Sequence, residues 1–397
     1  MRKRSAVVAA CATVACGVSY TATAASAAPP GPSTGMTFSV VASHLDNPRG
    51  LSGRDDVVYV AEGGHGDPSQ CFHVAGQPTV LAACVGKTGA LTRVSIDNDR
   101  SGPPQITVKQ VVTGLVSIGG DPSGIASSGP AAVSHDDGHL YGLMSGNTQL
   151  PPLQEPVPAP LLASLKSQLG QLLVAKRGGG IKTLAGVGDY DYRWSARHKD
   201  LVPGQFPDSN PNAVLVDDGR AWVVDAGSNT LDLVSHGKVR VVAFFPVPAG
   251  SITDSVPTCV SKGPDGALYV GELLGGDYAP GHARVWRVVP GHRPTVWATG
   301  LTAVNGCGWS HGSFYATEFE SHGLNEGPTA DPSGDVAVLD RNGHITAHLG
   351  VGELFYPSGF ATEDGGVFVS NCSIAPATGF GPCPEGGQLV QTGLRTH

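Results

Sequence analysis

Residues 254–275 read DSVPTCVSKGPDGALYVGELLG. This stretch predicts two β-strands joined by a tight turn. Pro257–Ser261 is the first run, Gly263–Gly266 is the turn, and Ala267–Val270 is the second run, which is rich in β-forming residues and bounded by glycines. The stretch therefore indicates antiparallel β-structure built from short strands.

The same pattern recurs five more times along the chain. The other copies begin near Asn47, Asp121, Asn210, Val304 and Tyr356. The proline that opens the first strand, or its equivalent, falls at Pro48, Pro122, Pro211, Pro257, Val304 and Pro357. The later copies are roughly 50 residues apart and each has room for about four strands, which is typical of a β-propeller. We therefore expect an all-β protein, a six-bladed β-propeller with four-stranded blades.

The first and last copies are irregular in complementary ways. The sixth copy has no fourth strand because the chain ends at His397, whereas a spare strand, Thr37–Ser43, precedes the first copy. We expect Thr37–Ser43 to complete the last blade. This pairing would remove the free sheet edges that an open ring exposes.

The composition suits this fold and excludes some functions. The chain has 397 residues, of which 56 are glycine and 15% are charged, which favours short strands and tight turns over disorder. The formal net charge is −8, and it becomes −11 if Arg2, Lys3 and Arg4 leave with a leader peptide. An acidic protein has no electrostatic basis for binding nucleic acid, so we expect no such partner.

The N-terminal residues have the pattern of an export signal. Arg2–Arg4 is basic, Ser5–Tyr20 is mostly small and apolar, and Ala25–Ala27 fits a cleavage site. We expect a signal peptide at 1–27, a linker at 28–36, and a single propeller domain at 37–397 that is secreted to the medium or the cell envelope and is monomeric. Thr13–Cys16 loosely resembles a lipoprotein cleavage box, which leaves a lipid anchor as the alternative. No other apolar run is long enough to span a membrane.

One insertion interrupts the second copy. Prolines at 151, 152, 156 and 158 precede Pro160–Gln168, where Leu161, Leu162 and Leu165 share one face. A proline at the start and an apolar face predict a helix. We expect this Pro-rich and helical insertion, near 150–168, to be the only helix of the mature chain.

Six cysteines remain once Cys11 and Cys16 leave with the signal peptide, and an even count in an exported chain suggests disulfides. Cys71 and Cys84 share one loop, Cys372 and Cys383 share the matching loop of the last copy, and Cys259 and Cys307 lie on the innermost strands of neighbouring copies. Of the 15 pairings that six cysteines allow, these positions select 71–84, 259–307 and 372–383. Free buried thiols are the alternative.

The chain resembles the ScyD/ScyE family, secreted six-bladed propellers that are named from a cyanobacterial pigment cluster and are common in actinobacteria. The stretches that carry the resemblance are DSNPNAVLVDDGRAWVVDAGSNTLDLVS from Asp208, DSVPTCVSKGPDGALYVGELLG from Asp254 and ARVWRVVPGHRPTVWATGL from Ala283. The resemblance implies the propeller and export, but no activity. More distantly the copies are similar to NHL repeats, which usually bind other macromolecules.

Two rows of polar residues fall on one face of the predicted ring. The first row, a candidate ligand-binding set, is Asn47, Asp121, Asn210 and Asn305, with Arg49 and Asn212 close by. The second row takes one equivalent position in each copy, namely Glu62, Met144, Asp225, Glu272, Glu318 and Asn371. Carboxylates near the axis can hold Ca²⁺, which takes six to eight oxygen ligands, so Glu62, Asp225, Glu272 and Glu318 are candidate ligands. The alternative is that each acid accepts hydrogen bonds from the backbone of its own following turn.

Two further acidic motifs are better explained as turns. Asp97–Gly102 imitates the start of an EF-hand loop, but its twelfth position is Val108 and no helices flank it. His135–His139 contains Asp-Gly, a common hairpin turn. Neither motif adds a metal site.

Two classes of function remain open. The first is a non-catalytic binding or scaffolding protein that holds a protein, a glycan or a small molecule. The second is a calcium-dependent hydrolase of the lactonase type with its site at the axis. No histidine falls in either polar row, which weakens the case for an enzyme because hydrolysis needs a general base. If there is a site, we expect it at the axis, on the face with the long loops between second and third strands.

Overall fold

The computed structural model describes residues 37–97, 104–176, 180–202, 205, 207–246, 254–275, 279–323, 331–363 and 366–392. The expected signal peptide and linker lie outside the described residues, and so does most of the Asp97–Gly102 turn. None of the helices in the described ranges is long and apolar enough to cross a bilayer.

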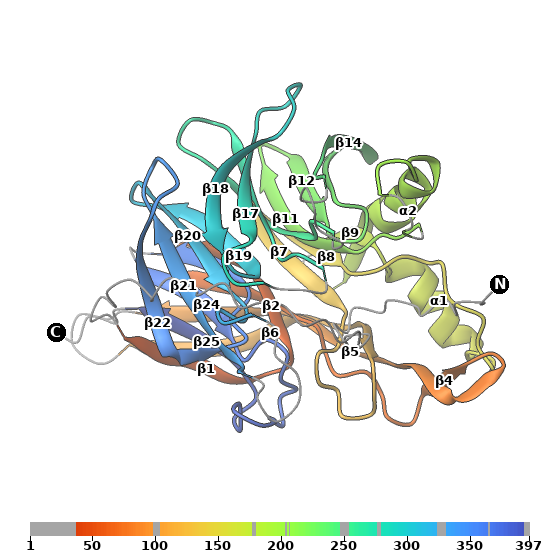
Figure 1. The fold of residues 1–397 in the computed structure, drawn as a ribbon. Helices are drawn as coiled ribbons and strands as arrows, with labels where there is room; N and C mark the ends of the chain where they lie inside the picture. Colours follow the sequence, from red (N-terminus) through yellow and green to blue (C-terminus); the bar gives the residue numbers. More distant parts are fainter. Residues whose placement is uncertain are drawn as a thin grey trace, which may run out of the picture.

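The described chain forms six antiparallel sheets that follow one another around a ring, as predicted (Figure 1). In each sheet, consecutive strands pair with one another. Blade 1 contains β2 (Pro48–Arg54), β3 (Val57–Glu62), β5 (Gln77–Asp97) and β6 (Gln105–Gly119), and blade 2 contains β7 (Pro130–Asp136), β8 (His139–Met144), β9 (Gln171–Ala175) and β10 (Ile181–Gly186). Blade 3 contains β11 (Pro211–Asp217), β12 (Arg220–Asp225), β13 (Thr230–Ser235) and β14 (Lys238–Phe244), and blade 4 contains β15 (Pro257–Lys262), β16 (Leu268–Glu272), β17 (Ala283–Val288) and β18 (Thr295–Leu301). Blade 5 contains β19 (Val304–Ser310), β20 (Ser313–Glu318), β21 (Ser333–Leu339) and β22 (Ile345–Phe355).

The sixth blade joins the two ends of the described chain. Its strands are β23 (Phe360–Glu363), β24 (Gly366–Asn371), β25 (Gly387–Thr392) and β1 (Phe38–Leu45). The pairing of β1 with β25 runs from Phe38 opposite Thr392 to Leu45 opposite Gly387 (Figure 1). This confirms that the N-terminal strand completes the last blade, so the ring closes without an unpaired edge between its ends.

In blades 1 to 5, the start of the first strand pairs with the end of the second strand. The pairs are Pro48 with Glu62, Pro130 with Met144, Pro211 with Asp225, Pro257 with Glu272 and Val304 with Glu318. The structure corrects the second copy, in which the first strand begins at Pro130 and not at Pro122. The error arose because β6 runs on to Gly119 and a connecting segment, rather than a strand, follows it.

Most apolar side chains are buried between neighbouring sheets. Second strands are the most enclosed, because all residues of β16 and β24 are buried. Between blades 4 and 5 the packing is aromatic, with the ring of Tyr269 lying 4.9 Å from that of Trp297 and 5.0 Å from that of Trp309. Core clusters therefore span neighbouring blades, and blades 2 to 5 bury apolar side chains against one another.

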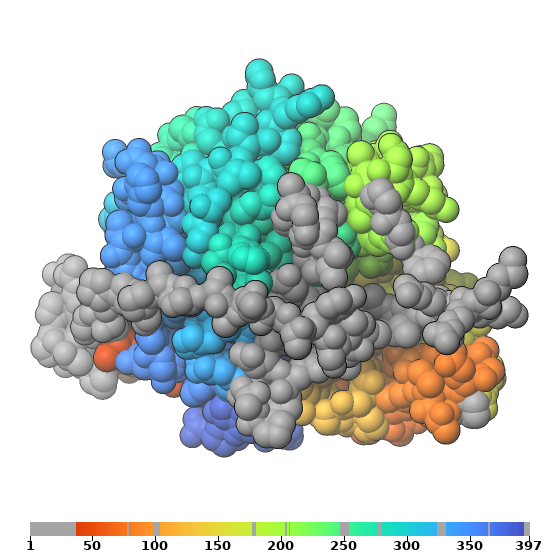
Figure 2. Space-filling model, viewed as in Figure 1, coloured from red at the N-terminus to blue at the C-terminus, as the bar shows by residue number. Residues whose placement is uncertain are grey.

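Three elements lie outside the regular blades. The strand β4 (Cys71–Val74) pairs with the first part of β5 and forms a hairpin, which is orange in Figure 2. The predicted helix is present as α1 (Ala159–Gln168). The expectation of a single helix was wrong, because a second helix, α2 (Val187–Arg197), follows β10.

All three predicted disulfides are present. Cys71–Cys84 links β4 to β5, Cys259–Cys307 links β15 of blade 4 to β19 of blade 5, and Cys372–Cys383 closes the loop between β24 and β25. Cys71–Cys84 therefore closes the β4–β5 hairpin, Cys259–Cys307 joins blades 4 and 5, and Cys372–Cys383 constrains one loop of blade 6.

Candidate functional site

A narrow cavity lies along the axis of the ring. Its volume is about 70 Å³, and each of the six blades lines it with three consecutive residues in or next to its first strand. Of the residues predicted to bind a ligand, Arg49, Asn212 and Asn305 line this channel. The Cys259–Cys307 disulfide is part of the same wall.

Polar side chains that line this axial channel form hydrogen bonds with backbone carbonyls of the segment or blade that follows. A β-bulge follows the first residue of β2, β7, β11, β15 and β19, and a bulge re-aims the side chain beside it. Asn212 Nδ2 donates to the carbonyl of Thr258 at 2.9 Å, and Arg49 Nη2 donates to that of Ser127 at 2.7 Å. Thr258 Oγ1 in turn donates to the carbonyl of Val304 at 2.6 Å. These bonds connect adjacent blades, while ligand binding by Arg49, Asn212 and Asn305 stays a prediction.

Of the other members of the first polar row, two form hydrogen bonds within the fold and one is exposed. Asn47 Nδ2 donates to the carbonyls of Gly64 and Gly124, both at 2.9 Å, and Asn210 Oδ1 accepts the N–H of Gly146 at 3.1 Å. Both asparagines therefore hold loops together where a first strand begins. Asp121 is exposed on the segment after β6. Its equivalence to Asn47 was wrong, because the first strand of blade 2 begins at Pro130.

The second polar row is regular, because every member ends the second strand of its blade and is buried. In four blades this side chain accepts a backbone N–H from the segment that enters the same blade. The donors to Glu62, Asp225, Glu318 and Asn371 are Asp46, Asn210, Thr302 and Phe355. Asp225 also accepts the N–H groups of its own following turn, at Gly227 and Ser228. These side chains fasten the chain where it enters each blade, and calcium binding by Glu62, Asp225, Glu272 and Glu318 stays a prediction.

Blade 3 contains a group of buried carboxylates. Asp191 of α2 lies next to Asp225 and Asp232, and all three are fully buried. Among the described residues, no N–H or hydroxyl group donates to either carboxylate oxygen of Asp191 or to Oδ1 of Asp232. Burial and the two neighbouring carboxylates hold the pKa of Asp191 well above its usual range, and burial raises the pKa of Asp232 to about 7. The raised pKa values therefore favour protonated carboxyl groups where Asp191, Asp225 and Asp232 meet.

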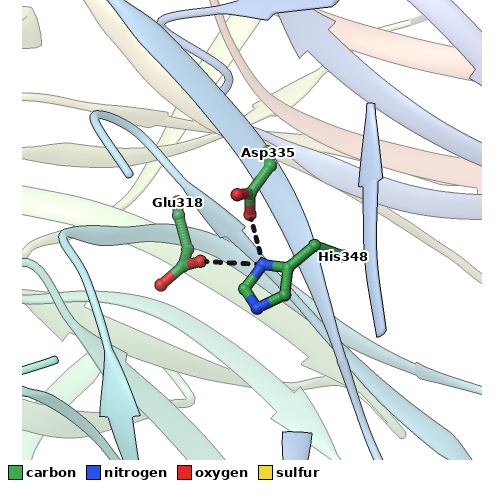
Figure 3. A group of neighbouring side chains, drawn as sticks. All are labelled: Glu318, Asp335 and His348. Atoms are coloured by element: carbon green, nitrogen blue, oxygen red, sulfur yellow. Dashed lines mark hydrogen bonds and ion pairs between the residues drawn. The ribbon is translucent and has the colours of Figure 1, made fainter. Parts of the chain in front are cut away.

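Blade 5 contains a mixed group of two acids and a histidine (Figure 3). His348 Nδ1 lies 3.1 Å from Asp335 Oδ1 and 3.4 Å from Glu318 Oε2. Hydrogen bonds to Asp335 and Glu318 raise the pKa of His348 to about 10, and burial raises that of Glu318 to about 8. The ligand atoms of these three side chains all lie within 4.8 Å of one another. In the described part of the chain, no other group of three or more metal-ligating side chains is this close together.

A concavity larger than the axial cavity lies between blades 1, 2 and 3. It holds about 460 Å³, which is within the range of ligand-binding pockets. Its walls come from the β4–β5 hairpin, the segment 145–157 after β8, the helices α1 and α2, and the segment that leads into β11. Figure 1 shows β4, α1 and α2 on one side of the ring. The pocket is therefore built by the insertions, on the face where second strands end.

Specific contacts hold the hairpin against the insertion of blade 2. His73 donates its backbone N–H to Glu155 Oε2 at 2.8 Å, and its ring Nδ1 lies 2.9 Å from Glu155 Oε1. The backbone also pairs, since Ala75 donates to the carbonyl of Pro152 and Gln154 donates to that of His73, both at 2.9 Å. The Cys71–Cys84 disulfide closes the base of the hairpin. These contacts fix the hairpin to the insertion, and both segments contribute to the wall of the pocket.

The lining of the pocket combines apolar side chains with several polar ones. Phe72, Val85, Leu150, Leu153 and Leu165 are among its apolar residues. Its polar side chains are Ser128, Ser145, Asn147, Gln149, Tyr192, Gln205, Asp208, Ser209 and Asn210. Burial raises the pKa of the Asp208 carboxyl to about 6. No histidine, cysteine, lysine or arginine occurs among the described residues that line it.

The sequence did not point to this pocket or to the two buried groups. Asp191, Asp335 and His348 are isolated residues in strands or in a helix, and only the tertiary fold brings each beside a member of the second polar row. Glu318 and Asp225 carried a signal, because they recur once per copy. The insertion near 150–168 and the long stretch around Cys71–Cys84 were visible, but their contact was not.

Comparisons with known proteins support no family assignment. No family model matches the sequence, and no curated protein matches it. Solved structures with similar folds include a catalytically inactive virginiamycin B lyase from Staphylococcus aureus with quinupristin, at 12% identity and a TM-score of 0.47, which covers 90% of this chain and 98% of that one. A protein provisionally named a gluconolactonase is 10% identical with a TM-score of 0.48, over 90% of this chain and 93% of that one. The WD40 β-propeller domain of Doa1 is 12% identical with a TM-score of 0.43, over 91% of this chain and 98% of that one. Likenesses this weak carry no argument about function, and the six-bladed fold rests on the strand pairing.

Proposed function

We propose that this protein is a non-catalytic binding propeller, exported and of the ScyD/ScyE kind, that holds a small and largely apolar ligand between blades 1, 2 and 3. The observation that carries the proposal is the pocket of about 460 Å³ that the insertions build. Concave sites with apolar walls and a few polar groups are the usual form of small-molecule sites. The three disulfides agree with export.

The charge of the lining narrows the class of ligand. Asp208 is the acidic side chain of the described wall, and that wall has no basic residue. An anionic ligand would meet a carboxylate without a counter-charge, which disfavours it. The best match is a neutral molecule, or one with a single amine or hydroxyl group, whose apolar body lies along Phe72, Leu153 and Leu165.

The lining also supports binding rather than hydrolysis. A hydrolytic site needs a nucleophile or an activated water next to a general base. The described wall supplies Asp208, whose Oδ1 accepts the backbone N–H of Ser209 at 2.7 Å. The axial channel has less support as a catalytic site, because its cavity is about 70 Å³ and Arg49, Asn212 and Thr258 hydrogen-bond to neighbouring blades.

Binding and turnover can be separated in one experiment. The purified protein is incubated with a panel of neutral apolar compounds, lactones and esters, with and without Ca²⁺, while its melting temperature and the integrity of each compound are followed. We expect pocket-filling compounds to raise the melting temperature, because a ligand of the native state adds stability, and to be recovered intact. Calcium-dependent hydrolysis of a lactone or ester would contradict the proposal.

A further inference from the structure

Three adjacent strands of blade 5 each place one metal-ligating side chain in the same buried spot. Glu318 ends β20 and lies opposite Asp335 of β21, and His348 of β22 lies two residues further along the sheet, opposite Ala337. The side chains are 3%, 7% and 15% exposed, in the order Glu318, Asp335 and His348. Figure 3 shows both carboxylates directed at His348.

The charges of this group balance within the protein only while one of the two carboxyl groups is protonated. Two ionised carboxylates require two positive charges, and His348 can supply one. Neither carboxylate forms an ion pair with a lysine or arginine of the described chain. A buried charge without a partner is costly, so one further positive charge in the same place would stabilise the folded state.

Blade 4 shows how the same position is balanced from within the chain. Glu272 is the equivalent of Glu318 and ion-pairs with the Arg284 guanidinium, while Trp286 Nε1 donates to its Oε2 at 2.8 Å. That group has one carboxylate and one permanent cation. Blade 5 has a second carboxylate and, in place of arginine, a residue that can give up its proton and ligate a metal through nitrogen.

We propose that Glu318, Asp335 and His348 bind one divalent transition-metal ion, with Zn²⁺ as the best match. Zinc–ligand bonds of ~2.1 Å at a tetrahedral angle place two ligand atoms about 3.4 Å apart. The Nδ1 of His348 lies 3.1 Å and 3.4 Å from the two carboxylate oxygens. Replacing the His348 proton with Zn²⁺ makes two carboxylates, a neutral imidazole and the ion electrically neutral.

The ligand set also selects against the alkaline-earth ions. Calcium takes six to eight oxygen ligands, and magnesium keeps several waters, whereas one nitrogen and two carboxylate oxygens suit zinc. The second oxygen of Glu318 accepts the backbone N–H of Thr302, which fixes the carboxylate toward His348. The site is in blade 5, apart from the pocket between blades 1, 2 and 3, and does not depend on the proposed function.

Metal titration of the whole purified protein tests this site. After dialysis against EDTA, ZnCl₂ is added and binding is followed by calorimetry, with CaCl₂ as the comparison. We expect one Zn²⁺ per chain with micromolar affinity or better, a higher melting temperature, and weak or no binding of Ca²⁺. His348→Gln and Asp335→Asn should each weaken zinc binding by about 100-fold or more.

Two controls keep the result interpretable. Glu272→Gln changes the equivalent position of blade 4 and should leave zinc binding unchanged. His322→Gln removes an exposed histidine that pairs with Asp331 and should also leave it unchanged, which excludes a surface histidine. If the blade 5 variants do not fold, Co²⁺ added to the unaltered protein should give visible absorption from a low-coordinate site. Absence of both zinc binding and that absorption, or full binding by His348→Gln, would overturn the proposal.

Discussion

At the scale of single residues, the recurring position at the end of each second strand explains much of the buried polarity. Glu62, Asp225, Glu318 and Asn371 use it to accept the backbone N–H of the entering segment. Once a carboxylate is fixed at this position, the neighbouring side chains decide how its charge is compensated. Blade 4 supplies Arg284, blade 5 supplies Asp335 and His348, and blade 3 supplies two more aspartates.

The carboxylates of blade 3 should make stability depend on pH. In the unfolded chain Asp191 titrates near 4, while in the folded protein its pKa is raised, so folding takes up protons at pH values between the unfolded and the folded pKa. This contribution to stability is complete at low pH and is lost as the pH rises from about 4 through the raised folded pKa of Asp191. Asp191→Asn should therefore flatten this loss of stability with rising pH, with a gain in stability at pH 8 and less change at pH 5.

Urea unfolding at pH 5 and pH 8 checks this expectation. Asp189→Asn, on the same helix, is the matched control, because the Asp189 carboxylate accepts hydrogen bonds from Thr148 and its loss should cost stability at both pH values. An Asp191→Asn protein that is less stable than the original at pH 8 would contradict the account.

At the scale of elements, the added hairpin and the insertion of blade 2 form the pocket together. Removing the Cys71–Cys84 disulfide with Cys71→Ala and Cys84→Ala should loosen the hairpin, since closing a loop of this length contributes about 3 kcal/mol. We expect faster proteolysis within 65–88 and weaker ligand binding, while the blades stay folded. Mass spectrometry of limited digests measures this.

The same change at Cys372 and Cys383 is the control, because that disulfide closes a loop of blade 6, away from the pocket lining. It should alter proteolysis of its own loop and leave ligand binding unchanged. If the Cys71–Cys84 variant binds ligand as well as the original protein does, the hairpin is not a required wall.

Sequence patterns predicted the blades, their closure and the helix α1, but not the helix α2 or the contact between the two insertions. Strands Pro257–Lys262 and Leu268–Glu272 flank a turn signal that the other copies repeat, so the repeat was recognised although the first strand of the second copy was misplaced. The helix α2 begins after Gly186 without a side-chain cap, so it lacks the usual start signal. The contact between His73 and Glu155 joins residues of two insertions, and neither has a counterpart in other copies from which it could be inferred.

At the scale of the whole molecule, one strand holds the ring closed. Deleting residues through Ser43 removes most of β1 and exposes the edge of β25, which should cause aggregation or a large fall in melting temperature. Deletion through residue 36 keeps β1 and is the control. A chain truncated at Ser43 that melts as the longer one does would show that the closure contributes little.

The central claim is that the pocket between blades 1, 2 and 3 binds a small apolar ligand. Its most direct test is a fluorescence titration with the neutral probe N-phenyl-1-naphthylamine. Three proteins are compared: the original chain, Ala82→Trp, which fills the pocket from the wall, and Val80→Trp, which adds the same bulk at an exposed position of the same strand. We predict saturable binding of one probe per chain by the original protein and by Val80→Trp, and its loss in Ala82→Trp. Equal binding by all three proteins, or none by the original, would contradict the claim.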